Sequence, residues 1–192
     1  MGQITMATTL TSPHSLEEFL KLPEEKPALE FFDHRIYQKP MPRRRHSILQ
    51  FEISSAINQI AKPAKIAYAF PELRCTFAGR SIVPDIVVLL WEHIEFGSDG
   101  EPRDDVLISP DWMIEILSPE KNSGWVIRKI LFSLEQGGQL GWLVDPGDCS
   151  VVAFFPDRLP KSLQGSDPLP VLSGIPWPIS ADQLFDWLKM SV

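Results

Sequence analysis

Residues 112–119, Trp-Met-Ile-Glu-Ile-Leu-Ser-Pro, predict a buried β-strand that carries a single charge. Five of the first six side chains are apolar, which is typical of a strand covered on both faces. Ser118-Pro119 ends the strand, because proline has no N–H to donate to a sheet. The exception is Glu115, whose carboxylate is costly in an apolar strand unless a cation or hydrogen bonds compensate it. The stretch therefore predicts an interior strand that also carries a candidate for chemistry.

A second acid stands at the start of another apolar strand, which is predicted over residues 85–91. Asp85 follows Val83-Pro84 and precedes Ile86-Val87-Val88-Leu89-Leu90. Two such acids on neighbouring strands could converge on one divalent cation, since carboxylate oxygens are the ligands that hard cations prefer. The structural alternative stays open for each acid, which could instead cap a backbone or pair with an arginine.

Around these two strands the pattern alternates between helical and extended segments. Helices are predicted from Ser15 to about residue 20 and over 43–61, 123–136 and 180–188. Strands are predicted over 28–32, 35–38, 66–70, 74–77, 140–144 and 150–155, with a loop over 96–105 and ordered loop with an edge strand over 156–178. This order predicts an α/β or α+β domain, a central mixed sheet flanked by helices. We expect residues 1–13 to be disordered and residues 14–190 to form one domain.

Composition narrows the class of protein. The 192 residues are 44% hydrophobic and 22% charged, which is ordinary for a globular chain with a sizeable core. No apolar run has the length of a membrane helix, and no secretory signal precedes the domain. Two cysteines, Cys75 and Cys149, are too few for a disulfide scaffold, so a cytoplasmic location is expected. The net charge of −7 argues against a polycation that coats nucleic acid, although a local basic groove remains compatible with it.

The helix over 123–136 carries a lysine beside its apolar side. The buried stripe is predicted to contain Val126, Ile127, Ile130, Leu131 and Leu134. Lys129 lies on the flank of this stripe and could point back towards the sheet. The alternative is that Lys129 lies on the surface and is solvated.

Taken together, these pieces resemble the Uma2 family of endonucleases, the former DUF820 proteins, within the PD-(D/E)XK nuclease superfamily. The resemblance is carried by Leu29-Glu30, His46, Val83-Pro84-Asp85, Glu115-Ile116-Leu117-Ser118-Pro119, Lys129 with Gly137, and Trp142-Leu143-Val144-Asp145-Pro146. It implies a restriction-endonuclease-like core and a metal-dependent DNA endonuclease. Departures from the family pattern lie around the site: His34, Ser133 and Gly141 replace the usual glycine and two tyrosines.

The resemblance also implies a set of site residues. Mg²⁺, or Mn²⁺ in its place, would be held by Asp85, Glu115 and the backbone carbonyl of Ile116. The superfamily motif places a lysine at position 117, where this chain has leucine, so the catalytic lysine is expected to be Lys129. Glu30 matches an acid that related nucleases place near the metal, with a surface acid as the alternative.

A basic cluster precedes and opens the helix over 43–61. Lys39, Arg43, Arg44 and Arg45, with His46, lie within eight residues, and a helix start favours phosphate by its dipole and its free N–H groups. The cluster is therefore a candidate phosphate-binding site for the DNA that the resemblance implies as partner. The alternative is that the arginines are a solvated helix start, and a histidine in the position of His46 is more often a satisfied core residue than a ligand. Two rival functions remain: a non-cleaving nuclease-fold domain that binds nucleic acid or a protein partner, and a hydrolase of small phosphoesters. A homodimer is expected if the protein cuts both strands.

Overall fold

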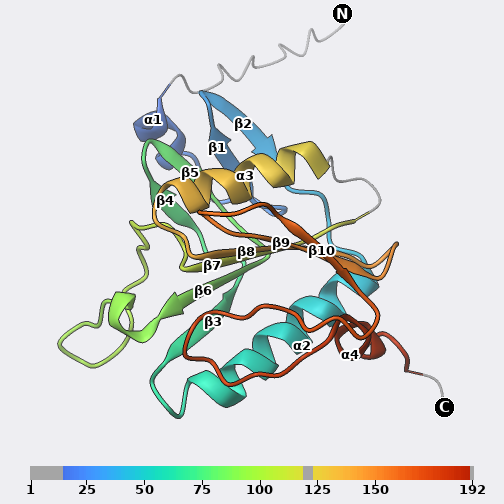
Figure 1. Cartoon of the computed structure of the whole chain (residues 1–192). Coiled ribbons are helices and arrows are strands. Elements are labelled where there is room, and N and C mark those ends of the chain that lie inside the picture. Colours follow the sequence, from blue (N-terminus) through green and yellow to red (C-terminus); the bar gives the residue numbers. More distant parts are fainter. Residues whose placement is uncertain (1–14, 119–122, 191–192) are drawn as a thin grey trace, which may run out of the picture.

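The structure is a computed structural model that describes residues 15–118 and 123–190. It contains two β-sheets, and helices cover the larger one (Figure 1). The helices are α1 (Leu16–Leu20), α2 (Arg44–Ala61), α3 (Ser123–Glu135) and α4 (Ala181–Asp186), with a short 3₁₀ turn over Trp91–His93. The strands are β1 (Leu29–Phe32), β2 (Arg35–Gln38), β3 (Ala67–Pro71), β4 (Cys75–Phe77), β5 (Arg80–Ile82), β6 (Ile86–Leu90), β7 (Trp112–Ile116), β8 (Leu140–Asp145), β9 (Ser150–Phe154) and β10 (Lys161–Gln164). The predicted disordered start, residues 1–13, lies outside the described residues.

The larger sheet is mixed and has the order β10-β9-β8-β7-β6-β3. Only β7 and β8 are parallel, and α3 makes the crossover between them, as a parallel pair requires. The remaining pairs are antiparallel, and β6 lies directly beside β7. The two strands that carry the candidate acids are therefore neighbours near the middle of the sheet, and the predicted mixed sheet with flanking helices is confirmed.

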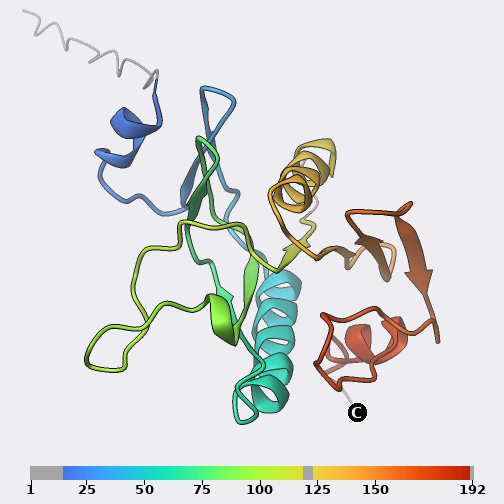
Figure 2. The same ribbon diagram turned by 60° about the vertical axis from the view of Figure 1, so that its left-hand side comes forward.

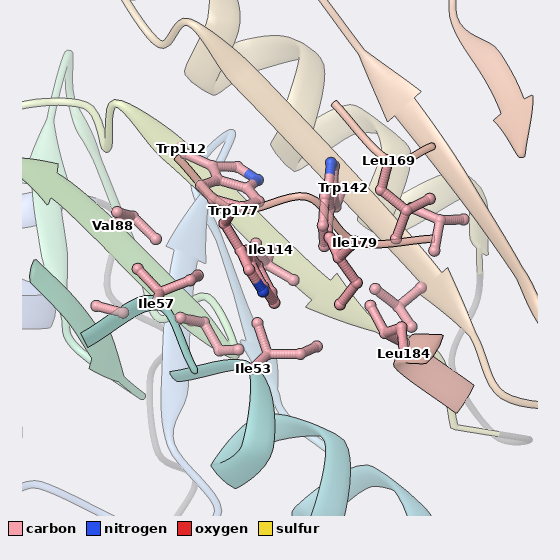
Figure 3. Close-up of a cluster of buried hydrophobic side chains, with 14 of the residues drawn as sticks. Ile53, Ile57, Val88, Trp112, Ile114, Trp142, Leu169, Trp177, Ile179 and Leu184 are labelled. Carbon is pink, nitrogen blue, oxygen red and sulfur yellow. The ribbon is translucent and has the colours of Figure 1, made fainter. Parts of the chain in front are cut away.

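One face of this sheet packs against α2 and the C-terminal segment with α4. Trp112, Ile114 and Ile116 of β7 alternate onto this face and are fully buried. Figure 3 shows Ile114 near Ile53 and Ile57 of α2, while Leu169, Ile179 and Leu184 close the core from the C-terminal side. Because side chains alternate along a strand, Glu115 must point to the opposite face.

The opposite face is covered by α3 and by a second, four-stranded sheet of order β2-β1-β5-β4 (Figure 2). Strands β1 and β2 form an antiparallel hairpin that turns at Asp33-His34, where both residues have positive φ. The sequence predicts one central sheet and does not predict the second one, because β5 has only three residues and shows no periodic pattern. No helix of the described residues is long and apolar enough to cross a bilayer.

The buried side of α3 differs from the predicted stripe. The placement of Leu131 in the core is wrong, because its side chain is 42% exposed. Lys129, Phe132 and Ser133 are buried instead. The reason is the second sheet, which gives α3 another partner: Phe132 stacks on Phe77 of β4 at a centroid distance of 5.0 Å.

Close packing of α3 on the large sheet depends on Gly141 of β8. A Cβ at this position would overlap the Cγ2 atom of Ile130. We expect Gly141→Ala to destabilise the fold by about 1–3 kcal/mol, as overpacking does, measured by urea unfolding. In the double variant Gly141→Ala/Ile130→Ala, the decrease in the free energy of unfolding should be smaller than the sum of the decreases in the two single variants. Strict additivity would contradict the proposed contact.

Candidate active site

Asp85 is a buried acid that contacts residues of three separate segments of the chain. Its side chain is fully buried just before β6, and its Oδ1 accepts from Nζ of Lys39 at 2.7 Å. Its Oδ2 accepts from the backbone N–H of Ile116 at 2.8 Å and lies 3.0 Å from Nε2 of His46. The backbone carbonyl of Asp85 accepts from the side chain of Gln50, four residues after His46 on α2. These bonds fix the carboxylate relative to β7 and to the start of α2.

Glu115 forms the second part of the site with two residues that are distant in the sequence. Nζ of Lys129 lies 2.7 Å from Oε1 of Glu115, and 2.8 and 3.1 Å from the two carboxylate oxygens of Glu30. All three side chains are at most 2% exposed. Lys129 therefore points back towards the sheet, and the surface alternatives for Lys129 and Glu30 do not hold.

Two backbone segments join these parts into one ionic cluster, defined here as Glu30, Lys39, His46, Asp85, Glu115 and Lys129 (all buried). Val83 donates its N–H to Oε1 of Glu30 at 2.9 Å, and its carbonyl accepts from Nζ of Lys39 at 2.8 Å. Ile116, next to Glu115, donates its N–H to Asp85. The acids on β1, β6 and β7 are thus held in one contiguous hydrogen-bonded network.

Lys129 is the central cation of the ionic cluster, since its ammonium group lies beside the carboxylates of both Glu30 and Glu115. Burial by itself lowers the pKa of Lys129, but the carboxylates of Glu115 and Glu30 outweigh it and raise that pKa. Lys129 is therefore a permanent cation at neutral pH.

The donors of the ionic cluster suit a hard divalent cation. Among the described residues, no three His, Cys, Asp or Glu side chains converge closely enough to enclose a metal. Magnesium does not require such a cage, since it is usually held by one or two carboxylates together with water and substrate phosphates. Asp85 and Glu115 supply two carboxylates, and the N–H of Ile116, the residue after Glu115, is bonded to Asp85.

The basic residues of the sequence divide into two groups. The side chains of Arg43, Arg44 and Arg45 are exposed around the start of α2, where they line a pocket of about 690 Å³ together with His46. Lys39 lies elsewhere than expected: it is 7% exposed, and its amine is bonded to Asp85 and the Val83 carbonyl. The neighbouring residues, a short strand before Lys39 and Pro40 after it, do not indicate that Lys39 pairs with Asp85. Sequence patterns also gave no sign that Ser118 lines the pocket.

The chain is similar to known proteins in both sequence and fold. The family model of Uma2, described as "putative restriction endonuclease", matches residues 16–183. The fold is similar to the crystal structure of a "putative nuclease belonging to DUF820" from Anabaena variabilis ATCC 29413, with a TM-score of 0.89 and 44% sequence identity. The similarity covers 92% of this chain and 99% of the other. No curated protein matches the sequence.

Loss of the Lys129 charge should destabilise the fold. Lys129→Met leaves Glu30 and Glu115 buried beside each other without their ammonium partner, at a cost of about 3–5 kcal/mol. Because the pKa of Lys129 is raised, its contribution is complete at every pH below the usual lysine pKa and is lost only as the pH rises through the higher, folded-state value. Urea unfolding at pH 7 and pH 9 should therefore give the same large difference between parent and variant. The exposed lysine of β10 provides the control Lys161→Met, and equal stability of both variants would contradict the buried ion pairs.

Proposed function

The chain belongs to the Uma2 family, and from this membership we propose that it is a Mg²⁺-dependent DNA endonuclease that hydrolyses phosphodiester bonds. The observation that carries the proposal is the ionic cluster itself, which lies beside an arginine-lined pocket. Its acids, in β1, in β7 and just before β6, are paired with two buried lysines. Mn²⁺ is expected to replace Mg²⁺, since both take oxygen ligands.

Asp85, Glu115 and the backbone carbonyl of Ile116 would hold the metal. When bound, Mg²⁺ supplies positive charge against the non-bridging and leaving oxygens of the phosphodiester. In the structure as described, Lys39 neutralises Asp85 and Lys129 neutralises Glu115. Each ammonium group must therefore share its carboxylate with the cation.

Lys129 stabilises the negative charge that develops on the phosphate and orients the attacking water. Its raised pKa suits this role better than proton abstraction, because a permanent ammonium cannot act as a base. Glu30 holds the amine in place through both of its carboxylate oxygens, so we propose that it acts as a positioning residue for Lys129. Arg43, Arg44 and Arg45 supply the local positive charge that the acidic chain needs to bind the DNA backbone.

A non-cleaving, nuclease-fold domain that binds nucleic acid or a partner is the second candidate. The observation in its favour is that Asp85, Glu115 and Glu30 each have a lysine ammonium group as a partner. In that case the ionic cluster would serve to hold the two sheets and α3 together.

Removal of one carboxylate charge distinguishes the two candidates. We expect Asp85→Asn and Glu115→Gln each to lower Mg²⁺-dependent nicking of supercoiled plasmid by at least about 10²-fold, the scale of losing one preorganised electrostatic contact. These substitutions preserve side-chain shape, and circular dichroism checks that the fold is retained. The matched control is Asp111→Asn, a buried aspartate outside the ionic cluster that bonds His93 and the Leu90 amide. If both cluster variants nick as fast as the parent, the metal site is wrong; if the parent itself only binds DNA, the second candidate is correct.

The arginines at the start of α2 should set the salt dependence of DNA binding. Each lost phosphate contact is expected to flatten the slope of log K against log salt by about 0.9, so the triple Gln variant of Arg43, Arg44 and Arg45 should be markedly less salt-sensitive. The control variant replaces Arg35, Arg103 and Arg158 with Gln. These arginines are exposed at other places on the surface, so the control changes the net charge by the same amount as the test variant. An equal slope in the two variants would show that charge at the helix start has no special contact with DNA.

A further inference from the structure

The pocket at the start of α2 contains polar groups that its own chain leaves unsatisfied. It has a volume of about 690 Å³ and is lined by residues 43–46, by Leu117 and Ser118 after β7, by Ser123, and by residues 145–147 at the end of β8. Among the described residues, neither Nδ1 of His46 nor Oγ of Ser118 has a hydrogen-bond partner. The two residues are only 4% and 8% exposed.

Buried polar atoms without partners are rare and cost about 1–3 kcal/mol each. The ring of His46 is held through Nε2, which lies 3.0 Å from Oδ2 of Asp85, so Nδ1 is the nitrogen left to bond elsewhere. Ser118 directly follows Leu117, whose N–H is bonded to the Val144 carbonyl, so its position is likewise fixed by the sheet. A pocket with two pre-positioned polar atoms indicates a polar ligand.

The start of α2 specifies the charge of that ligand. The N-cap residue, Arg43, makes no side-chain capping bond, and the first turn of this 18-residue helix contains no acid. Arg44 and Arg45 lie in the first turn, at the positive end of the helix dipole, where cationic side chains are unfavourable and an anion is favoured by the dipole and the N–H groups. Asp145 also lines the pocket, but its Oδ1 accepts from the N–H groups of Gly147 and Asp148.

We infer that this pocket is a subsite for one backbone phosphate of DNA, next to the phosphate that is cut; this inference rests on the proposed function. The hydroxyl of Ser118 donates to a phosphate oxygen, and the arginines surround it. Nε2 of His46 donates to Asp85, so Nδ1 reaches the phosphate through a bridging water. His46 thereby joins the bound phosphate to the acid that is proposed to hold the metal, and it acts as a positioning residue.

Phosphate binding can be measured without any cleavage. Inorganic phosphate, titrated into the protein by calorimetry at constant ionic strength, should bind at one saturable site. Ser118→Ala should weaken this binding about tenfold, as expected for loss of one hydrogen bond to a charged group, and Ser118→Thr, which keeps the hydroxyl, should restore most of it. The control is Ser162→Ala on the exposed strand β10. Absence of saturable binding, or equal affinity of Ser118→Ala and the parent, would overturn the inference.

A second measurement separates a DNA phosphate from a free one. DNA duplexes that carry a single neutral methylphosphonate at successive positions are tested for binding in Ca²⁺. At one position the neutral linkage should weaken binding of the parent protein by a larger factor than binding of Ser118→Ala, which has already lost one of the contacts to that phosphate. If inorganic phosphate binds but no position has this effect, the pocket is not a DNA subsite. Failure of the parent to nick DNA would refute the proposed nuclease activity. The two binding experiments test phosphate binding in the pocket and do not depend on that result.

Discussion

Three carboxylates are buried where the small sheet, the large sheet and α3 meet, and they can remain there only because two lysines and several N–H groups compensate them. Taking such ions out of water costs several kcal/mol each, so every partner must be in place. Lys129 can reach both Glu30 and Glu115 only if α3 packs across the sheet and β1 lies beside it. The electrostatic requirement of the interior therefore determines how the two sheets sit relative to α3.

The same constraint connects the interior to the surface. Oδ1 of Asp85 is paired with Lys39, and Oδ2 accepts from the Ile116 amide and lies 3.0 Å from Nε2 of His46. His46 in turn lines the arginine-rich pocket at the start of α2. A ligand phosphate in that pocket would thus lie one side chain away from the proposed metal ligand, which is the spatial relation that a phosphodiester hydrolase needs.

Much of this arrangement could be predicted from periodicity and from misplaced charge. The sequence predicts the strands beside Asp85 and Glu115 because both are apolar runs that contain or follow a single acid, and it predicts α2 because that helix is long and periodic. The suggestion that Lys129 could point back towards the sheet is confirmed by its burial between Glu30 and Glu115. The second sheet, the burial of Phe132 and the pairing of Lys39 with Asp85 could not be predicted, since they depend on contacts between segments more than 40 residues apart. Local patterns contain no information on such pairings, and the three-residue strand β5 that completes the second sheet is too short to show a period.

The central claim, that the buried acids form a metal site, is tested most directly by anomalous diffraction from crystals soaked in Mn²⁺. We expect one strong peak in contact with the carboxylates of Asp85 and Glu115, with the amine of Lys39 or of Lys129 displaced from its carboxylate. Crystals that show no peak at the ionic cluster at millimolar Mn²⁺, with both lysines still paired as described, would contradict the metal site and leave the ionic cluster a structural element.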